Sequence, residues 1–204
     1  MKKSLIYLFT SLVILTNCVS QQKVDFQNGD IIFQTTSSSQ CEAVQLATHS
    51  QYSHCGMLYF KNNRWYVLEA VGPVKFTLLK EFISHGKNKH YVIKRVKDFT
   101  KEKWQQQDSS IQKFIHQQLG KPYDIYFNWD ENNIYCSELV WKFYHTCFNI
   151  EVGKLQQMKE FDLKHPAVQA ILQERYGKHI PYHEKVISPA SIFESSTLIL
   201  IEEN

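Results

Sequence analysis

The stretch SHCGMLYFKNNRWYVLEAV, residues 53–71, consists of two strand-like runs on either side of an Asn-Asn pair. Asn tolerates the left-handed backbone that a tight two-residue turn requires, so the pattern predicts a β-hairpin that turns at residues 62–63. Side-chain alternation then places His54 and Glu69 on the same face of the hairpin, diagonal to each other. A glutamate side chain is long enough to bring its carboxylate to the imidazole ring across that diagonal.

The same alternation assigns two more residues of the hairpin. Gly56 shares the face of His54, and we expect it to leave open space above the sheet. Cys55 is expected to point to the opposite face, away from the imidazole.

The segments around the hairpin predict further strands and helices of one domain. Residues 31–34 and 90–96 are rich in aliphatic, aromatic and β-branched side chains and predict strands. Apolar residues at helical spacing predict helices at 42–47, 101–119 and 136–147, from Pro166 to a stop at Gly177, and a short last helix capped by Ser188. No linker rich in Pro, Gly or Ser divides the chain. We therefore expect a single α+β domain, a small antiparallel sheet or half-barrel packed on helices.

The N-terminus differs in composition from the rest of the chain. Two lysines precede an apolar run from Leu5 to Leu15, which predicts a signal peptide over residues 1–17. This run is shorter than the ~20 apolar residues that a membrane-spanning helix needs. Cys18 follows in a sequence similar to the bacterial lipobox, so it is a candidate for lipidation and membrane tethering. We expect an exported protein, in the periplasm or anchored as a lipoprotein of the cell envelope, with residues 18–204 as its mature domain.

Composition argues against two classes of partner. The 23 Lys and Arg against 20 Asp and Glu leave a net charge of +3, and the basic residues are scattered, so nucleic acid is not expected to bind. The five Cys form no C-x-x-C pair and no Cys/His array of zinc-finger spacing. His49 and His54, five positions apart, point to different faces of a strand or helix. We therefore expect no metal and no cofactor.

The segment YCSELVW, residues 135–141, places a cysteine where a loop ends and an apolar helix begins. Backbone N–H groups at a helix N-terminus favour the thiolate form of Cys136, which attacks carbonyl groups. His54 would accept the thiol proton, and Glu69 would hold the Nδ1–H of that imidazole. Together the three residues predict a nucleophile, a base and an orienting carboxylate.

Structural roles are open for the same residues. A His–Glu pair forms hydrogen bonds in many protein cores, and a cysteine at the start of a helix is often an inert small hydrophobe. Glu138 lies in the first helical turn, where its charge suits the helix dipole, which favours a capping role. Tyr123 and Tyr52 are weaker candidates for donating a hydrogen bond to a developing oxyanion, because most tyrosines serve packing.

Several motifs in one order resemble the permuted papain-like amidases of the YiiX and YaeF type, in the NlpC-like cysteine hydrolase superfamily. The resemblance covers most of the mature chain. It is carried by GDIIFQ (29–34), SSQ (38–40), ATHS (47–50), YSHCG (52–56), LEA (68–70), YCSELVWK (135–142) and ISP (187–189). The histidine precedes the cysteine, the reverse of the order in papain. The resemblance implies a circularly permuted papain-like fold with Cys136 as nucleophile, His54 as base and Glu69 as orienting residue.

The sequence thus predicts an exported cysteine hydrolase that cleaves an amide bond through an acyl-enzyme on Cys136. We expect a small peptide-like or N-acylated envelope molecule as substrate. A second interpretation is a thioesterase or acyltransferase that acts on lipids, since related permuted folds use the same Cys and His on acyl chains. A third is a catalytically inactive envelope-binding lipoprotein, against which the intact set of Cys136, His54 and Glu69 argues.

Overall fold

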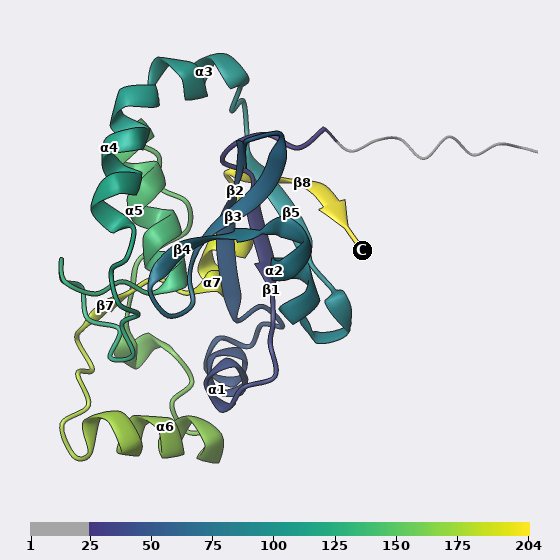
Figure 1. Cartoon of the computed structure of the whole chain (residues 1–204). Helices are drawn as coiled ribbons and strands as arrows, with labels where there is room; N and C mark the ends of the chain where they lie inside the picture. Colours follow the sequence, from purple (N-terminus) through teal and green to yellow (C-terminus); the bar gives the residue numbers. More distant parts are fainter. Residues whose placement is uncertain (1–24) are drawn as a thin grey trace, which may run out of the picture.

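The computed structural model describes residues 25–204, so the predicted signal peptide (1–17) and Cys18 lie outside the described residues. Its central feature is a six-stranded antiparallel sheet of order β4-β3-β2-β1-β5-β8 (Figure 1). The strands are β1 (Ile31–Gln34), β2 (His54–Lys61), β3 (Arg64–Ala70), β4 (Val74–Leu78), β5 (Val92–Val96) and β8 (Leu198–Glu203). The predicted antiparallel sheet on an α+β chain is confirmed.

The hairpin of β2 and β3 has the predicted register. Its ladder runs from Lys61 opposite Arg64 to Met57 opposite Leu68. Both turn asparagines have positive φ angles, 49° and 59°, as a type I′ turn requires. The ladder ends just before the predicted His–Glu pair, which lies at the end of the hairpin remote from the turn.

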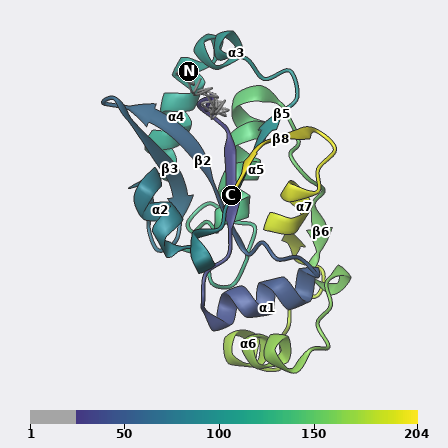
Figure 2. The ribbon, with the colours of Figure 1, turned by 90° about the vertical axis from the view of Figure 1, so that its right-hand side faces the viewer.

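Helices cover one face of the sheet and close one of its ends. α5 (Cys136–Phe148) packs against β2, while α4 (Asp108–Gln118) and α7 (Pro189–Phe193) pack against α5 (Figure 1). α1 (Ser39–Thr48) and α6 (Pro166–Tyr176) pack side by side beyond the end of the sheet, at the bottom of both views (Figures 1 and 2). The N-terminus of α5 therefore points toward the region where the sheet, α1 and α6 meet.

Strand alternation divides the apolar residues between the two faces of the sheet. The larger cluster, which includes Phe33, Cys55, Met57, Leu139 and Phe143, fills the space between the sheet and α5. A smaller cluster on the other face contains Ile32, Leu58, Val67 and Phe82, the last from α2 (Leu79–His85). The remaining short elements are η1 (Lys87–Lys89), α3 (Lys101–Gln106), β6 (Gln156–Gln157), η2 (Met158–Glu160) and β7 (Lys185–Val186).

The structure departs from the sequence prediction in two places. The helix predicted over 101–119 is broken at Gln107, where ψ is 11°, into α3 and α4. α3 buries only Trp104, so little packing holds it in line with α4. Seven elements were not predicted: β4, α2, η1, β6, η2, β7 and β8. Of these, β4 contributes a residue to the site described below.

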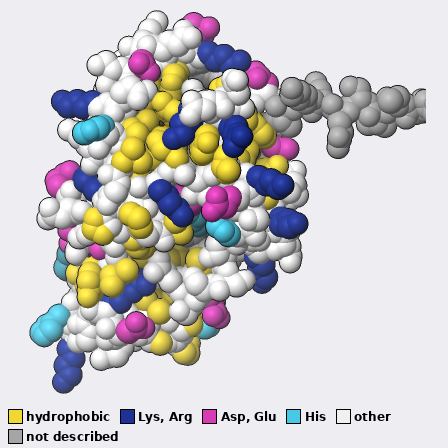
Figure 3. All heavy atoms as spheres, viewed as in Figure 1, with side chains coloured by type: hydrophobic (Ala, Val, Ile, Leu, Met, Phe, Trp, Pro, Cys, Tyr) yellow, Lys and Arg dark blue, Asp and Glu magenta, His cyan; other side chains and the backbone are white. Residues whose placement is uncertain are grey.

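Exposed hydrophobic side chains on the face in Figure 3 lie among separate Lys and Arg side chains, and the described residues show no broad basic patch there. Among residues 25–204, no helix is both long and apolar enough to cross a membrane.

Candidate active site

His54 and Glu69 form a buried hydrogen-bonded pair. His54 Nε2 lies 2.6 Å from Glu69 Oε2, and only 7% of His54 and 3% of Glu69 are exposed. Thr77 Oγ1 donates a hydrogen bond of 2.5 Å to the other carboxylate oxygen, Oε1. Phe82 stacks on the imidazole with a centroid separation of 5.6 Å. The carboxylate and the ring are thus each fixed by a second neighbour.

Strand pairing explains these contacts. Thr77 on β4 pairs with Val67 on β3, so it lies on the face of Glu69 and diagonal to it. The predicted diagonal between His54 and Glu69 is confirmed, but the predicted ring nitrogen is wrong. Glu69 reaches the distal Nε2 rather than Nδ1, because its long side chain approaches the tip of the ring. Nδ1 is the ring nitrogen that Glu69 does not bind, so it is the one through which His54 would exchange a proton with Cys136.

Cys136 is the first residue of α5, as predicted, and 3% of it is exposed. Its two neighbours tie this helix start to the segment before α7. Ser137 Oγ donates to the backbone oxygen of Ile187 at 2.8 Å, and Tyr135 Oη accepts from the backbone N–H of Ile187 at 3.0 Å. The late ISP motif therefore holds Cys136 in place.

Cys136 lies close enough to His54 and Cys55 for both groups to lower its pKa, and it shifts their pKa values in turn. Cys55 does point away from the His54 face, as predicted, but α5 packs on the face where Cys55 lies. Burial, together with the neighbouring Cys136, raises the pKa of Cys55 well above its usual value. Cys55 therefore stays a neutral thiol beside Cys136.

Gly56 does not leave open space, contrary to the expectation from the sequence. A Cβ added at Gly56 would lie 2.4 Å from Val67 Cγ1, 2.9 Å from the Leu68 carbonyl oxygen and 3.3 Å from Glu69 Cβ. The absent side chain lets β3 approach β2 closely, which brings the Glu69 backbone toward His54.

The charges at the site favour a thiolate–imidazolium pair. The hydrogen bond from Cys55 is the largest cause of the low pKa of Cys136; burial opposes it, and His54 adds to it, so the pKa lies well below the usual value. Burial alone would lower the pKa of His54, but Cys136 and Glu69 outweigh burial and raise it to about 10. Burial alone would raise the pKa of Glu69, but its bonds to His54 and Thr77 keep it below the usual value.

Tyr123 lies beside Cys136 and forms the first link of a hydrogen-bonded chain. Gln40 Nε2 donates to Tyr123 Oη at 2.9 Å, and Arg175 Nη2 donates to Gln40 Oε1 at 2.6 Å. Burial, followed by the charge of Cys136, raises the pKa of Tyr123 well above its usual value, so its hydroxyl keeps its proton. Because the hydroxyl oxygen accepts from Gln40, its hydrogen is free to be donated into the site.

Tyr52 is not brought to this site. Its ring packs against Phe193 with a centroid separation of 4.2 Å, and its hydroxyl accepts a hydrogen bond from Gln51 Nε2. It does not line the pocket that contains Cys136. Of the two tyrosines predicted as oxyanion donors, the structure therefore places only Tyr123 near the thiol.

Cys136 and Tyr123 lie in the wall of an apolar pocket between α1, α6 and the 186–189 segment. The pocket comprises about 750 Å³ of atom-free space, including its opening to solvent. Among the described residues that line it, Arg175 is the one with a charged side chain. The apolar lining includes Ala43, Val44, Ala47, Phe161, Leu163, Val168, Ile171, Leu172 and Val186.

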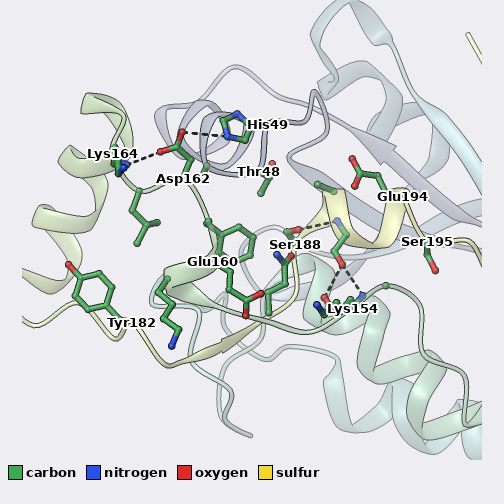
Figure 4. A pocket seen from close by; sticks show the side chains of 18 of the residues that line it. Thr48, His49, Lys154, Glu160, Asp162, Lys164, Tyr182, Ser188, Glu194 and Ser195 are labelled. Atoms are coloured by element: carbon green, nitrogen blue, oxygen red, sulfur yellow. Dashed lines mark hydrogen bonds and ion pairs between the residues drawn. The ribbon is translucent and has the colours of Figure 1, made fainter.

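A wide polar groove adjoins this pocket and shares Ala47, Thr48, Phe161, Leu163 and Ser188 with its lining. Figure 4 shows the groove, with His49 and Asp162 at one side and Glu194 and Ser195 at the other. His49 Nε2 lies 3.4 Å from Asp162 Oδ2. Three lysines and three carboxylates line the groove, so it has no clear charge preference.

Other predicted residues have structural roles. Glu138 lies in the first turn of α5, where Oε2 accepts from the backbone N–H of Tyr135 at 3.4 Å and Oε1 lies 2.8 Å from Lys142 Nζ. The capping role is confirmed.

The four cysteines of the described residues, Cys41, Cys55, Cys136 and Cys147, are all free thiols.

Comparison with known proteins gives consistent findings. A family model described as permuted papain-like amidase enzymes, YaeF/YiiX, matches residues 25–202. YiiX of Escherichia coli, described as uncharacterized, is 50% identical over 175 residues, which are 86% of this chain and 85% of YiiX. A crystal structure described as the metalloprotein yiiX from another strain of Escherichia coli has a TM-score of 0.82 and 48% identity, covering 87% of this chain and 97% of that one. The likeness therefore spans the whole fold.

Proposed function

The chain belongs to the YaeF/YiiX family of permuted papain-like amidase enzymes, and from this premise we propose that it is an exported cysteine hydrolase cleaving an amide bond of an N-acylated cell-envelope molecule. Membership also confirms the permuted papain-like fold expected from the sequence. One observation carries the proposal: the buried His54–Glu69 pair lies beside Cys136, the first residue of α5, close enough for His54 and Cys136 to shift each other's pKa.

The proposed reaction has two chemical steps. The Cys136 thiolate attacks the amide carbonyl, and the Tyr123 hydroxyl donates to the oxyanion that develops. His54, as imidazolium, gives its proton to the leaving amine, and the C–N bond breaks to leave a thioester on Cys136. Neutral His54 then takes a proton from water, which attacks the thioester; the C–S bond breaks, a carboxylic acid is released, and the Cys136 thiolate and His54 imidazolium are restored. Glu69 acts through His54 and is a positioning residue.

The apolar pocket supports an N-acylated substrate over a short polar peptide. Aliphatic side chains of α1 and α6 surround the space that leads from Cys136, so an acyl chain placed there would be removed from water. Each buried methylene contributes about 0.8 kcal/mol, which favours long acyl chains. The adjoining polar groove is suited to the hydrated remainder of the molecule.

We expect the enzyme to hydrolyse a decanoyl amide with a kcat/KM about a hundredfold above that of the matching acetyl amide, because several methylenes enter the pocket. Hydrolysis of both amides by the purified protein, with product amine measured, checks this. Equal rates for the two chain lengths would remove the acyl pocket from the proposal. The decanoyl thioester assayed beside the decanoyl amide separates amidase from thioesterase activity, since only an amidase cleaves both.

Export is part of the proposal and rests on residues 1–18, which lie outside the described residues. We expect fatty-acid labelling of the protein in bacterial cells and its loss in Cys18→Ser. A processed, unlabelled protein in the periplasm would exclude the lipid anchor but keep export. A protein that retains residues 1–17 in the cytoplasm would contradict export itself.

The crystal structure of yiiX from Escherichia coli is that of a protein described as a metalloprotein. Among residues 25–204 of this chain, no group of three or more His, Cys, Asp or Glu side chains is placed to hold a metal ion. The proposed reaction therefore contains no step that uses a metal.

A further inference from the structure

Arg175 lies in the wall of the pocket that contains Cys136 and is the pocket's charged lining residue. It comes from the last turn of α6, whose apolar face covers one side of the pocket. A guanidinium at this place is unusual because the other side chains around it are largely apolar.

Two contacts fix the position of this guanidinium. Nη2 donates to Gln40 Oε1 at 2.6 Å, and Cζ lies 5.3 Å from the centre of the Phe127 ring. Both contacts are with neutral groups. The charge of Arg175 is therefore held in place without being neutralised.

The second terminal nitrogen of the guanidinium, Nη1, is shielded from solvent. None of the residues 25–204 supplies a hydrogen-bond acceptor to it. Within the described part of the chain, no carboxylate lies within the 4.0 Å of an ion pair with Arg175. Asp124 is hydrogen-bonded to the backbone N–H of Tyr126 instead. Shielding an unpaired cation costs free energy, which a bound anion would recover.

We propose that Arg175 forms an anion subsite of the pocket, and that the substrate is an amphiphile with an acyl chain and a carboxylate or phosphate near the scissile amide. N-acyl amino acids and N-acylated phosphate headgroups share this chemistry. A small shift of the side chains that cover Arg175 would let its Nη1–H donate to an oxygen of the anion, while Nη2 stays bound to Gln40. The inference rests on the proposed function, since it assigns the substrate of the same site.

Binding tests the subsite separately from turnover. In the Cys136→Ala protein, which does not consume the probes, calorimetry would compare N-decanoylglycine, its neutral amide N-decanoylglycinamide, and N-decanoylphosphoethanolamine. We expect at least one anionic probe to bind about tenfold more tightly than the neutral amide, as one charge-assisted hydrogen bond in a shielded site provides. The tighter of the two anionic probes identifies carboxylate or phosphate as the preferred group.

Arg175→Gln, made in the same protein, should remove this preference and leave the affinity for the neutral amide within about twofold. Lys178→Gln, an exposed basic residue just beyond α6, is the matched control and should change neither affinity. Equal binding of charged and neutral probes, or a preference that survives Arg175→Gln, would overturn the subsite. If the wild-type protein still hydrolyses the neutral amide in that case, the proposed function stands without it.

Discussion

Glu69→Gln should lower kcat by about 10²–10⁴-fold, the range seen when the orienting residue of a catalytic triad is neutralised. The substitution keeps the shape of the side chain. It removes the negative charge that lies 2.6 Å from His54 Nε2 and helps to raise the pKa of the imidazole. Steady-state kinetics on an N-decanoyl amide measures the loss, with Glu81→Gln, an exposed glutamate on α2, as the matched control.

The pH profile distinguishes this positioning role from a structural one. The active form needs thiolate and imidazolium, so the alkaline limb of kcat/KM follows the pKa of His54, raised to about 10 by Cys136 and Glu69 against the effect of burial. Removing the Glu69 charge lowers that pKa, and the alkaline limb should move to lower pH. If Glu69→Gln lowers the melting temperature but leaves kcat and the profile of the folded fraction unchanged, Glu69 holds the fold and does not serve the reaction.

The second large effect is expected at Cys136. Cys136→Ala should reduce hydrolysis to the uncatalysed background, because the proposed acyl-enzyme cannot form without the sulfur. The fold should persist, since alanine fits where a buried thiol lay at the start of α5 and the ties of Tyr135 and Ser137 to Ile187 remain. Circular dichroism checks the fold, and residual turnover near the wild-type rate would contradict the mechanism.

The sequence was most informative where local geometry decides the contacts. An Asn-Asn turn has few conformations, so it determined the hairpin register and placed Glu69 on the diagonal of His54. A loop followed by an apolar helical pattern placed Cys136 at a helix N-terminus. Both predictions need only residues close together in the chain.

Residues that depend on packing between distant segments were missed. Thr77 lies on β4, whose five residues include exposed Lys75 and give a weak strand signal. Gln40 and Arg175 meet only because α1 packs on α6, and neither helix signals its partner in the sequence. Side-chain alternation correctly predicted that Cys55 points away from His54. It could not predict that α5 packs on the face where Cys55 lies, which brings Cys55 next to Cys136.

The central claim is that Cys136 is the activated thiol, and its alkylation rate tests this directly. Cys41 is the natural internal competitor: burial alone would raise its pKa, but hydrogen bonds with Ser38, Ser53 and Thr36 lower it overall. The folded protein would be treated with iodoacetamide at a series of pH values and the labelled cysteines mapped by mass spectrometry. We predict that Cys136 is labelled first at and below neutral pH, and that His54→Ala slows its labelling. Faster labelling of Cys41 while Cys136 stays unmodified would contradict the account.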